Sequence, residues 1–198
     1  MPPGPTKGDR TRLALLHAAI VRFAREGYRG TSVADVCRDA GLSTTASYPY
    51  FANKEALFIA AVDEDVAGLI DDAVSFVVIE QDPDQWGRVI MRALVAHVDA
   101  HPLAGRILRG LEPDFTMRLL QIPALEELRK TVTELIRAQQ MAGGVRQDIH
   151  AGQTASGLVV IVISLLMATM QTGAVAGGYE LVAADVESVL HAATRPSG

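Results

Sequence analysis

Cysteine is almost missing from this chain of 198 residues, which contains only Cys37. A single cysteine excludes an internal disulfide and any zinc site that needs several thiolates. Cys37 falls among apolar residues at helical spacing, so we expect a buried structural thiol, with a redox sensor as the alternative.

The sequence also lacks the motifs that carry common enzyme chemistry. It has no HExxH, GxSxG, Walker or dinucleotide-binding glycine pattern, and no base can be assigned to its one cysteine. His97 and His101 have the spacing of two metal ligands on a helix, but His101 precedes Pro102 at an expected helix end, where a histidine is favourable without a metal. We therefore expect no enzyme, no cofactor and no metal site.

Signals for β-strands are missing as well. The chain has no Asn-Gly or Asp-Gly hairpin turn and no sustained alternation of polar and apolar residues. No proline occurs between residues 124 and 195, which suits long helices separated by the glycine pairs at 143–144 and 177–178. The sequence predicts an all-α fold.

A targeting signal is not evident, because the first twelve residues contain no apolar core, and we expect a cytoplasmic protein. One later segment, residues 158–170, is almost wholly apolar, and no formal charge occurs between Asp148 and Glu180. The apolar run is shorter than the roughly 18 to 20 residues of a membrane span. We expect a buried helix that lies partly at a subunit interface, with a membrane span as the alternative.

The charge is divided unevenly along the chain. Residues 1–55 carry eight Lys and Arg against five Asp and Glu, a net charge of +3, while the rest of the chain has a net charge of −8. This asymmetry suggests that the front segment contacts a polyanion and that the acidic remainder keeps the protein in solution. An ordinary solvated basic face is the alternative.

Residues 31–58 contain the pattern of two short helices joined by a tight turn. Ser32 can cap a helix whose apolar residues share one face, namely Val33, Val36, Cys37 and Ala40. Gly41 supplies the turn, and Ser43 can cap a second helix that begins with Thr44 and Thr45. A helix with such a start enters the major groove in DNA-binding proteins.

A third helix is expected to begin after Asn53, a third capping residue. Lys54 brings a positive charge to its first turn, which is unfavourable for the helix dipole unless an anion such as a DNA phosphate lies close by. The whole stretch predicts a helix-turn-helix that binds DNA.

The run from Leu15 to Leu57 resembles the N-terminal domain of TetR-family transcriptional regulators. The matching features are Phe23, Gly27-Tyr28, Thr31-Ser32-Val33, Ala40-Gly41-Leu42-Ser43, Tyr48-x-Tyr50-Phe51 and Lys54-Glu55-Ala56-Leu57. Two departures stand near the end of the recognition helix: Ser47 replaces a large apolar residue, and Pro49 lies between the two tyrosines. They leave open whether that helix is shortened.

The resemblance implies a three-helix DNA-binding head followed by a helical ligand-binding and dimerisation body. We expect a flexible arm over residues 1–8, a head over residues 9–69 with its helix-turn-helix at about residues 32–51, and the body over residues 70–195. It also implies a homodimer built on the last two long helices, and therefore a palindromic operator in double-stranded DNA.

The expected DNA contacts fall into two groups. Thr44 and Thr45 can offer hydroxyls and methyl groups to base edges. Phosphate contacts, which fix the register, are expected from Thr31, Ser43, Tyr50 and Lys54. We expect Tyr48 and Phe51 to pack inside the head.

The resemblance further implies a small-molecule cavity among the middle helices. Large or adaptable apolar residues of that region are the candidates, although plain core is favoured for each one taken alone: Trp86, Met91, Phe115, Met117, Met141 and Met167. We expect a mostly apolar effector of unknown identity that releases a repressor from its operator. Repression is favoured over activation by the resemblance alone.

Two other functions remain open at this point. The first is a small helical ligand-binding protein or enzyme that uses the apolar body without sequence-specific DNA binding. The second is a helical scaffold whose head docks protein instead of DNA. Salt-sensitive binding to duplex DNA separates the DNA-binding regulator from both, because phosphate contacts release counterions.

Overall fold

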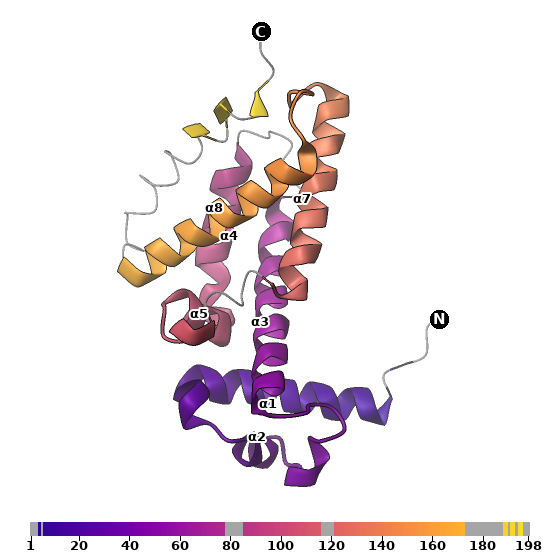
Figure 1. Ribbon diagram of the computed structural model, residues 1–198, viewed down its shortest axis with the longest axis vertical. Coiled ribbons are helices and arrows are strands. Elements are labelled where there is room, and N and C mark those ends of the chain that lie inside the picture. The colour runs from indigo at the N-terminus through magenta and orange to yellow at the C-terminus, as the bar shows by residue number, and fades with distance from the viewer. Residues whose placement is uncertain are drawn as a thin grey trace.

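A computed structural model describes residues 4, 6–77, 85–115 and 121–172, together with residues 188, 189, 191, 192, 194 and 195. Every regular element in these ranges is helical, which confirms the all-α prediction (Figure 1). The α-helices are α1 (Lys7–Gly30), α2 (Val33–Asp39), α3 (Lys54–Val77), α4 (Trp86–His97), α5 (Pro102–Leu108), α7 (Pro123–Ala142) and α8 (Ala151–Thr172). Single 3₁₀ turns are η1 (Thr44–Ala46), η3 (Val98–Ala100) and η4 (Pro113–Phe115).

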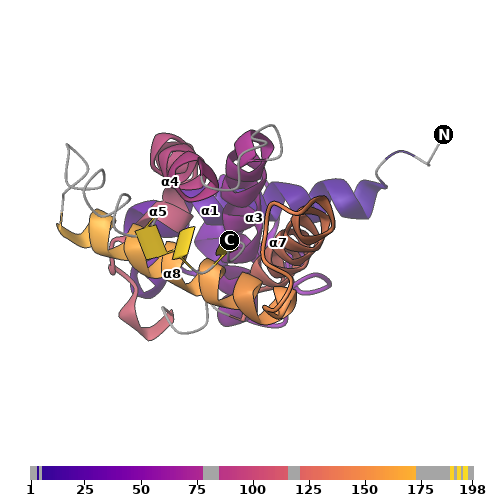
Figure 2. The same cartoon turned by 90° about the horizontal axis from the view of Figure 1, so that it is seen from above.

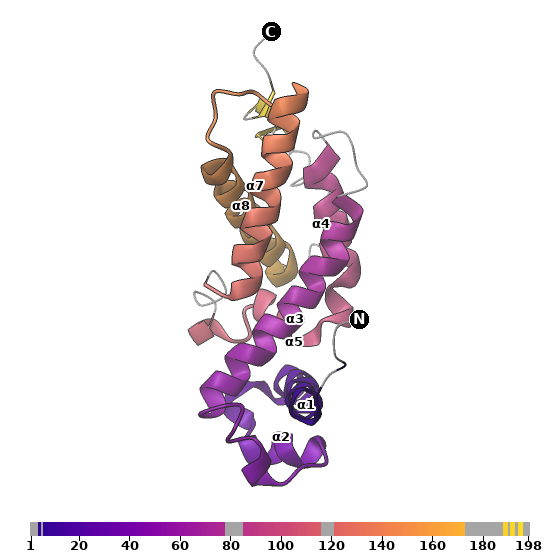
Figure 3. The same cartoon turned by 90° about the vertical axis from the view of Figure 1, so that its right-hand side faces the viewer.

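The molecule is elongated, with a head at one end and a body at the other. α1 and α2 form the head with the start of α3, and α1 crosses α3 near the head end (Figures 1 and 3). α3 then continues into the body, where it packs against α4, α5 and α7. Seen from above, α3 and α4 lie side by side while α8 crosses the body next to α7 (Figure 2).

Two capping boxes fix the starts of the first two helices. Thr6 accepts a hydrogen bond from the Asp9 backbone and Asp9 accepts one from the Thr6 backbone, so α1 begins at Lys7, inside the predicted flexible arm. Ser32 and Asp35 form the same arrangement at α2, which confirms Ser32 as a cap. The predicted head–body boundary at residues 69 and 70 lies within the continuous helix α3.

A cluster of four aromatic rings joins the head to the body. Phe23 and Tyr28 come from α1, Phe58 from α3, and Phe115 from the η4 turn. The Phe58 ring lies 4.9 Å from that of Phe23 and 4.5 Å from that of Phe115, centroid to centroid. Phe23 and Phe58 are fully buried. Such edge and tilted contacts add to the area that the rings bury, so the junction is a continuous core.

Helix α8 carries the apolar run that the sequence analysis singled out. In the described part of the chain it alone is long and apolar enough to cross a membrane, by length and composition only. About a fifth of its most apolar window, 22%, is buried inside the protein. A core helix passes the same test, and α8 packs along α7 with Ala155, Val159 and Leu166 buried. The prediction of a buried helix holds for this inner face only.

Candidate nucleic-acid interface

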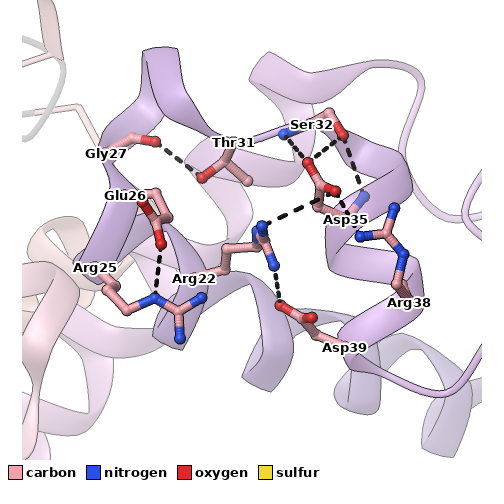
Figure 4. Close-up of polar contacts among 9 residues, drawn as sticks. All are labelled: Arg22, Arg25, Glu26, Gly27, Thr31, Ser32, Asp35, Arg38 and Asp39. Carbon is pink, nitrogen blue, oxygen red and sulfur yellow. Dashed lines mark hydrogen bonds and ion pairs between the residues drawn. The ribbon is translucent and has the colours of Figure 1, made fainter.

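The helix-turn-helix is tied to α1 by one arginine. Arg22 of α1 donates from Nη1 to Asp39 Oδ2 at 2.8 Å, and its Nη2 lies 3.9 Å from Asp35 Oδ1 (Figure 4). Both carboxylates stand on α2, at its first and last turns. Arg38 approaches Asp35 Oδ1 at 3.0 Å from the other side. The guanidinium therefore contacts both the first and the last turn of α2, and it fixes the direction of α2 relative to α1.

These contacts shift the ionisation of their members. Hydrogen bonds from the Ser32 side chain and backbone lower the pKa of Asp35, with help from the charges of Arg22 and Arg38. The hydrogen bond to Asp39 raises the pKa of Arg22. Asp35 therefore stays ionised where an ordinary aspartate would begin to protonate, and it holds both the α2 cap and the junction with α1.

The recognition element is short, which is the outcome that Ser47 and Pro49 left open in the sequence. After Gly41, whose φ of 69° suits a glycine, η1 forms a single 3₁₀ turn at Thr44–Ala46. Ser43 stands at the capping position, but its hydroxyl lies 3.1 Å from Thr45 Oγ1 and caps no backbone N–H. A full helix beginning at Ser43 was therefore wrong for this structure.

Ser47 and Pro49 explain why the element stops. The buried Ser47 hydroxyl donates to the Thr44 carbonyl at 3.1 Å, so a backbone acceptor that a helix would use is taken by a side chain. Pro49 has no N–H to continue a ladder. The chain instead makes a turn in which the N–H groups of Tyr50 and Phe51 both donate to the Ser47 carbonyl.

The six predicted DNA contacts differ in how far they reach solvent. Ser43, Thr44 and Thr45 are exposed at the end of the head, while Tyr50 and Lys54 are half-buried. Thr31 is 3% exposed, and its hydroxyl donates to the Gly27 carbonyl at 3.0 Å (Figure 4). The Thr31 side chain thus closes the end of α1, and a phosphate contact from it finds no support in this geometry.

Two aromatic residues of the turn lie in opposite environments. Phe51 is 6% exposed, as expected for a core residue, and the Arg12 guanidinium lies 5.8 Å from its ring centroid. Tyr48 is 67% exposed, so the expectation that it packs inside the head was wrong. The short turn explains this: η1 ends at Ala46, and Tyr48 comes after its C-cap residue Ser47, outside the helical turn. The motif Tyr48-x-Tyr50-Phe51, which carries part of the family resemblance, did not indicate that Tyr48 is exposed.

Lys54 and Asn53 open α3 as the sequence indicated. Asn53 Oδ1 accepts from the Ala56 N–H at 2.8 Å, which confirms the cap. The Lys54 ammonium lies 4.4 Å from the centroid of the Tyr28 ring. A cation over a ring face is stabilised without an anion, so the Tyr28 ring alone accounts for the position of Lys54 at the start of α3.

A cavity of about 140 Å³ lies in the body between α3, α4, α5, α7 and α8. Of the 21 residues that line it, none is charged, and Thr131 is the only one besides Trp86 whose side chain has a hydrogen-bonding atom. The other lining residues are aliphatic side chains or glycine, for example Leu69, Ile90 and Leu166. Such a lining suits an apolar small molecule.

Of the six residues predicted for this cavity, the structure brings one, Trp86, to its wall. Met91 of α4 is buried in the body core, and Phe115 belongs to the aromatic junction. Met141 is 83% exposed at the end of α7, and Met167 packs against the body core without lining the cavity. Met117 lies outside the described residues. The predicted set was therefore wrong in at least four members, because side-chain type gives no information about which helix face a cavity adjoins.

Histidines 97 and 101 do not form a metal site. The His97 ring nitrogen Nδ1 lies 2.8 Å from the Ala93 carbonyl, whereas His101 lies between Asp65 and Asp72 of α3. Within the residues that the structure describes, no group of three or more His, Cys, Asp or Glu could hold a metal ion. Cys37 is a buried free thiol, as expected.

Comparison with known proteins gives the class of this molecule. Residues 15–61 match the family model described as bacterial regulatory proteins, tetR family. The chain is similar to the HTH-type transcriptional repressor AcnR of Corynebacterium diphtheriae, with 29% identity over 147 residues that cover 73% of each protein. It is also similar to the HTH-type transcriptional repressor NicS of Pseudomonas putida, with 28% identity over 72% of this chain and 69% of NicS.

Solved structures agree on the fold. A TetR-family transcriptional regulator from Pectobacterium atrosepticum superposes with a TM-score of 0.74 at 20% identity, covering 97% of this chain and 98% of that one. The family-model match over the head and the curated repressor relatives support a helix-turn-helix DNA-binding transcriptional regulator, a class whose members are not enzymes. These matches support a TetR-family regulator.

The lowered pKa of Asp35 predicts a pH-dependent contribution to stability. Because the folded-state pKa lies below the unfolded value, ionised Asp35 stabilises the fold at pH values above the unfolded pKa, and this stabilisation is lost as pH falls through the folded pKa. Asp35→Asn should therefore lower the melting temperature at pH 7, and the difference from wild type should shrink towards pH 3. Thermal unfolding followed by circular dichroism measures both.

Ser32→Ala provides the matched control, because it removes the group with the largest effect on that pKa. In the Ser32→Ala background, Asp35→Asn should have a smaller effect at pH 7. An equal effect in both backgrounds would show that the Ser32 hydrogen bonds do not carry the stabilisation.

Proposed function

We propose that this regulator is a ligand-responsive repressor. It binds a palindromic operator as a homodimer in the cytoplasm and is released by a small, mostly apolar effector. The observation that carries the proposal is α3, a single 24-residue helix that begins beside the exposed end of the head and continues along the wall of the apolar cavity. A ligand in the cavity therefore contacts the same rigid element that supports the DNA-binding end.

For DNA, we propose that Thr44 and Thr45 contact base edges. Their exposure at the end of the head and their short hydrogen-bonding side chains support this role. Ser43, Tyr50 and Lys54 are proposed to contact phosphates, with Tyr48 added because of its exposure beside them. The head in this proposal spans residues 9–69 and the body residues 70–195, with α3 common to both.

For the effector, the uncharged lining argues against a ligand that buries an ionised group, because an unpaired charge is costly in such a site. An alkyl chain or a ring system meets the lining without leaving polar atoms unpaired. A solved structure of similar fold supports this class: the transcriptional regulator FadR from Bacillus subtilis, in complex with stearoyl-CoA, superposes with a TM-score of 0.67 at 14% identity, covering 90% of this chain and 96% of that one.

For the dimer, α8 offers an outward stripe at helical spacing. Its exposed residues recur mostly at three- or four-residue intervals and are uncharged: Gln153, Gly157, Val160, Ile161, Ser164, Ala168, Gln171 and Thr172. Val160 is 42% and Ile161 is 36% exposed, so two adjacent apolar side chains of this stripe face solvent in the single chain. A second copy related by a two-fold axis would cover this stripe and place two heads on one palindrome.

Selection of bound duplexes from a random DNA library tests the DNA proposal directly. Wild-type protein should enrich a palindrome, and a Thr44→Ala/Thr45→Ala variant should enrich an altered one, because each base contact is worth about 1 to 3 kcal/mol of discrimination.

Tyr50→Ala and Lys54→Ala should weaken binding on most sequences, and Lys54→Ala should reduce the slope of log affinity against log salt by about 1. No enrichment even at low salt would instead favour a ligand-binding protein without an operator.

Occupancy of the cavity can be followed through Trp86, because it is the only tryptophan of the chain and lines the wall. Titration with 1-alkanols should change its fluorescence, and affinity should rise with chain length by about 0.8 kcal/mol for each buried methylene. Ala73→Phe places a ring in the cavity and should abolish the response. Met141→Phe, at an exposed site, is the control. Equal responses from both variants would place the alkanol elsewhere.

The dimer is tested by charge on the α8 stripe. Val160→Glu/Ile161→Glu should convert the protein to a monomer in sedimentation velocity, because two carboxylates would be buried against their symmetry mates. Met141→Glu adds a carboxylate at an exposed site outside α8 and should leave the mass unchanged. A double variant with the wild-type mass would rule out α8 as the interface.

A further inference from the structure

Helix α5 has two faces that belong to different parts of the molecule. Leu103 and Ile107 are fully buried in the core that α1 and α3 share with the head. Ala104 and Leu108, one position further along, are buried in the body core and line the cavity. Residues four apart in a helix share a face, so one face of α5 packs on the core shared with the head and the adjacent face lines the cavity. Helix α5 is therefore a wall between the effector cavity and the head.

The start of α5 is fixed to α3 by one carboxylate. Asp65 is 6% exposed, and its Oδ2 accepts from the N–H groups of Leu103 and Ala104, both at 2.8 Å. Unpaired N–H groups at a helix start favour a negative charge, so this contact anchors the N-terminal end of α5.

The other end of α5 contacts the head through an ion pair. Arg106 Nε donates to Glu112 Oε1 at 2.8 Å, and the same oxygen accepts from the Tyr28 backbone N–H at 3.0 Å. Arg106 Nη1 also lies 3.4 Å from the Ala24 carbonyl. The side chains of Arg106 and Glu112 are 22% and 10% exposed. We call the pair with its contacts to the α1 backbone the Arg106–Glu112 latch.

The backbone conformation of α1 at Gly27 allows the contacts of the latch. At Gly27 the helix breaks, with φ 75° and ψ 171°, and this frees the Tyr28 N–H for Glu112. A Cβ at position 27 would lie 2.6 Å from Arg106 Nη2 and 2.8 Å from Glu112 Oε1. Both the positive φ and the close approach therefore require glycine. The latch holds main-chain atoms, so it restrains the direction of α1 as well as its distance from α5.

We propose that the Arg106–Glu112 latch positions the DNA-binding head: these two residues, which lie far from the reading turn, set the direction of α1 relative to the wall of the effector cavity. When α5 moves on its cavity side, the contacts of the latch transmit the displacement to α1. The ion pairs of Arg22 then transmit the change in the direction of α1 to α2. The latch is thus the regulatory link of the proposed repressor, and this inference rests on the proposed function above.

Two variants separate a role of the latch in positioning the head from a role in the folding of the head. Arg106→Met/Glu112→Leu removes both charges and leaves no unpaired ion in the buried site, a change that buried ion pairs often tolerate. Arg109→Met is the matched control, because Arg109, the residue directly after α5, pairs with Asp99 of the body at 3.0 Å. Each protein is titrated with a duplex that carries the two half-sites selected by the wild type, and with a duplex that carries one.

The latch variant should bind the two-site duplex about tenfold or more weaker than wild type, because misdirected heads lose the advantage of simultaneous engagement. Its affinity for the single half-site should stay within about twofold of wild type, since the reading turn itself is intact. Arg109→Met should match wild type on both duplexes. The latch variant should also accept a wider range of spacings between half-sites.

Two results would overturn the inference. Wild-type affinity of the latch variant for the two-site duplex would show that the pair does not position the head. Equal losses on both duplexes would show that the pair only supports the fold of the head. If the wild-type protein selects no duplex at all, the proposed function fails, and the inference fails with it.

Discussion

The close approach of a buried ion pair to an interrupted helix is the contact on which the arrangement of this regulator depends. Glu112 accepts a main-chain N–H that is available only because α1 breaks at Gly27. The same carboxylate neutralises Arg106, which would otherwise be a costly buried charge. Head and body therefore meet through directional contacts to backbone atoms, in addition to the packing of aromatic rings.

The aromatic junction and the latch have complementary effects. The rings of Phe23, Phe58 and Phe115 bury area between head and body, but ring contacts tolerate several geometries. Hydrogen bonds have a narrower angular range, so the latch selects one of the orientations that the rings allow. Helices α3 and α5 both border the cavity, and both reach the head, so a ligand would contact the two elements that determine the position of the DNA-binding surface.

The sequence predicted those features that depend on local chemistry. Capping residues such as Ser32 and Asn53 and the glycine turn at Gly41 each follow from short-range preferences that the tertiary structure left unchanged. Tyr48 and the length of the recognition element did not follow, because Ser47 takes a backbone acceptor only once it is buried against its neighbours.

The cavity and the latch required the structure for a related reason. A cavity wall is set by which helix faces oppose one another, and the predicted methionines and Phe115 fall on other faces. Arg106 and Glu112 are six residues apart from each other but about eighty from Gly27 and Tyr28, a separation that no local pattern reveals. Charge pairing in the sequence alone would have placed both residues on an ordinary solvated surface.

The most direct test of this account is the distance distribution between a spin label in the head and one in the body of the same chain. Labels at Val21→Cys and Met141→Cys occupy exposed sites, and a Cys37→Ala background removes the native thiol. Dilution with unlabelled protein isolates the distance within one chain. The account predicts a narrow distribution that broadens or shifts when Arg106→Met/Glu112→Leu is introduced. An unchanged narrow distribution would contradict it, because the head would then be positioned without the latch.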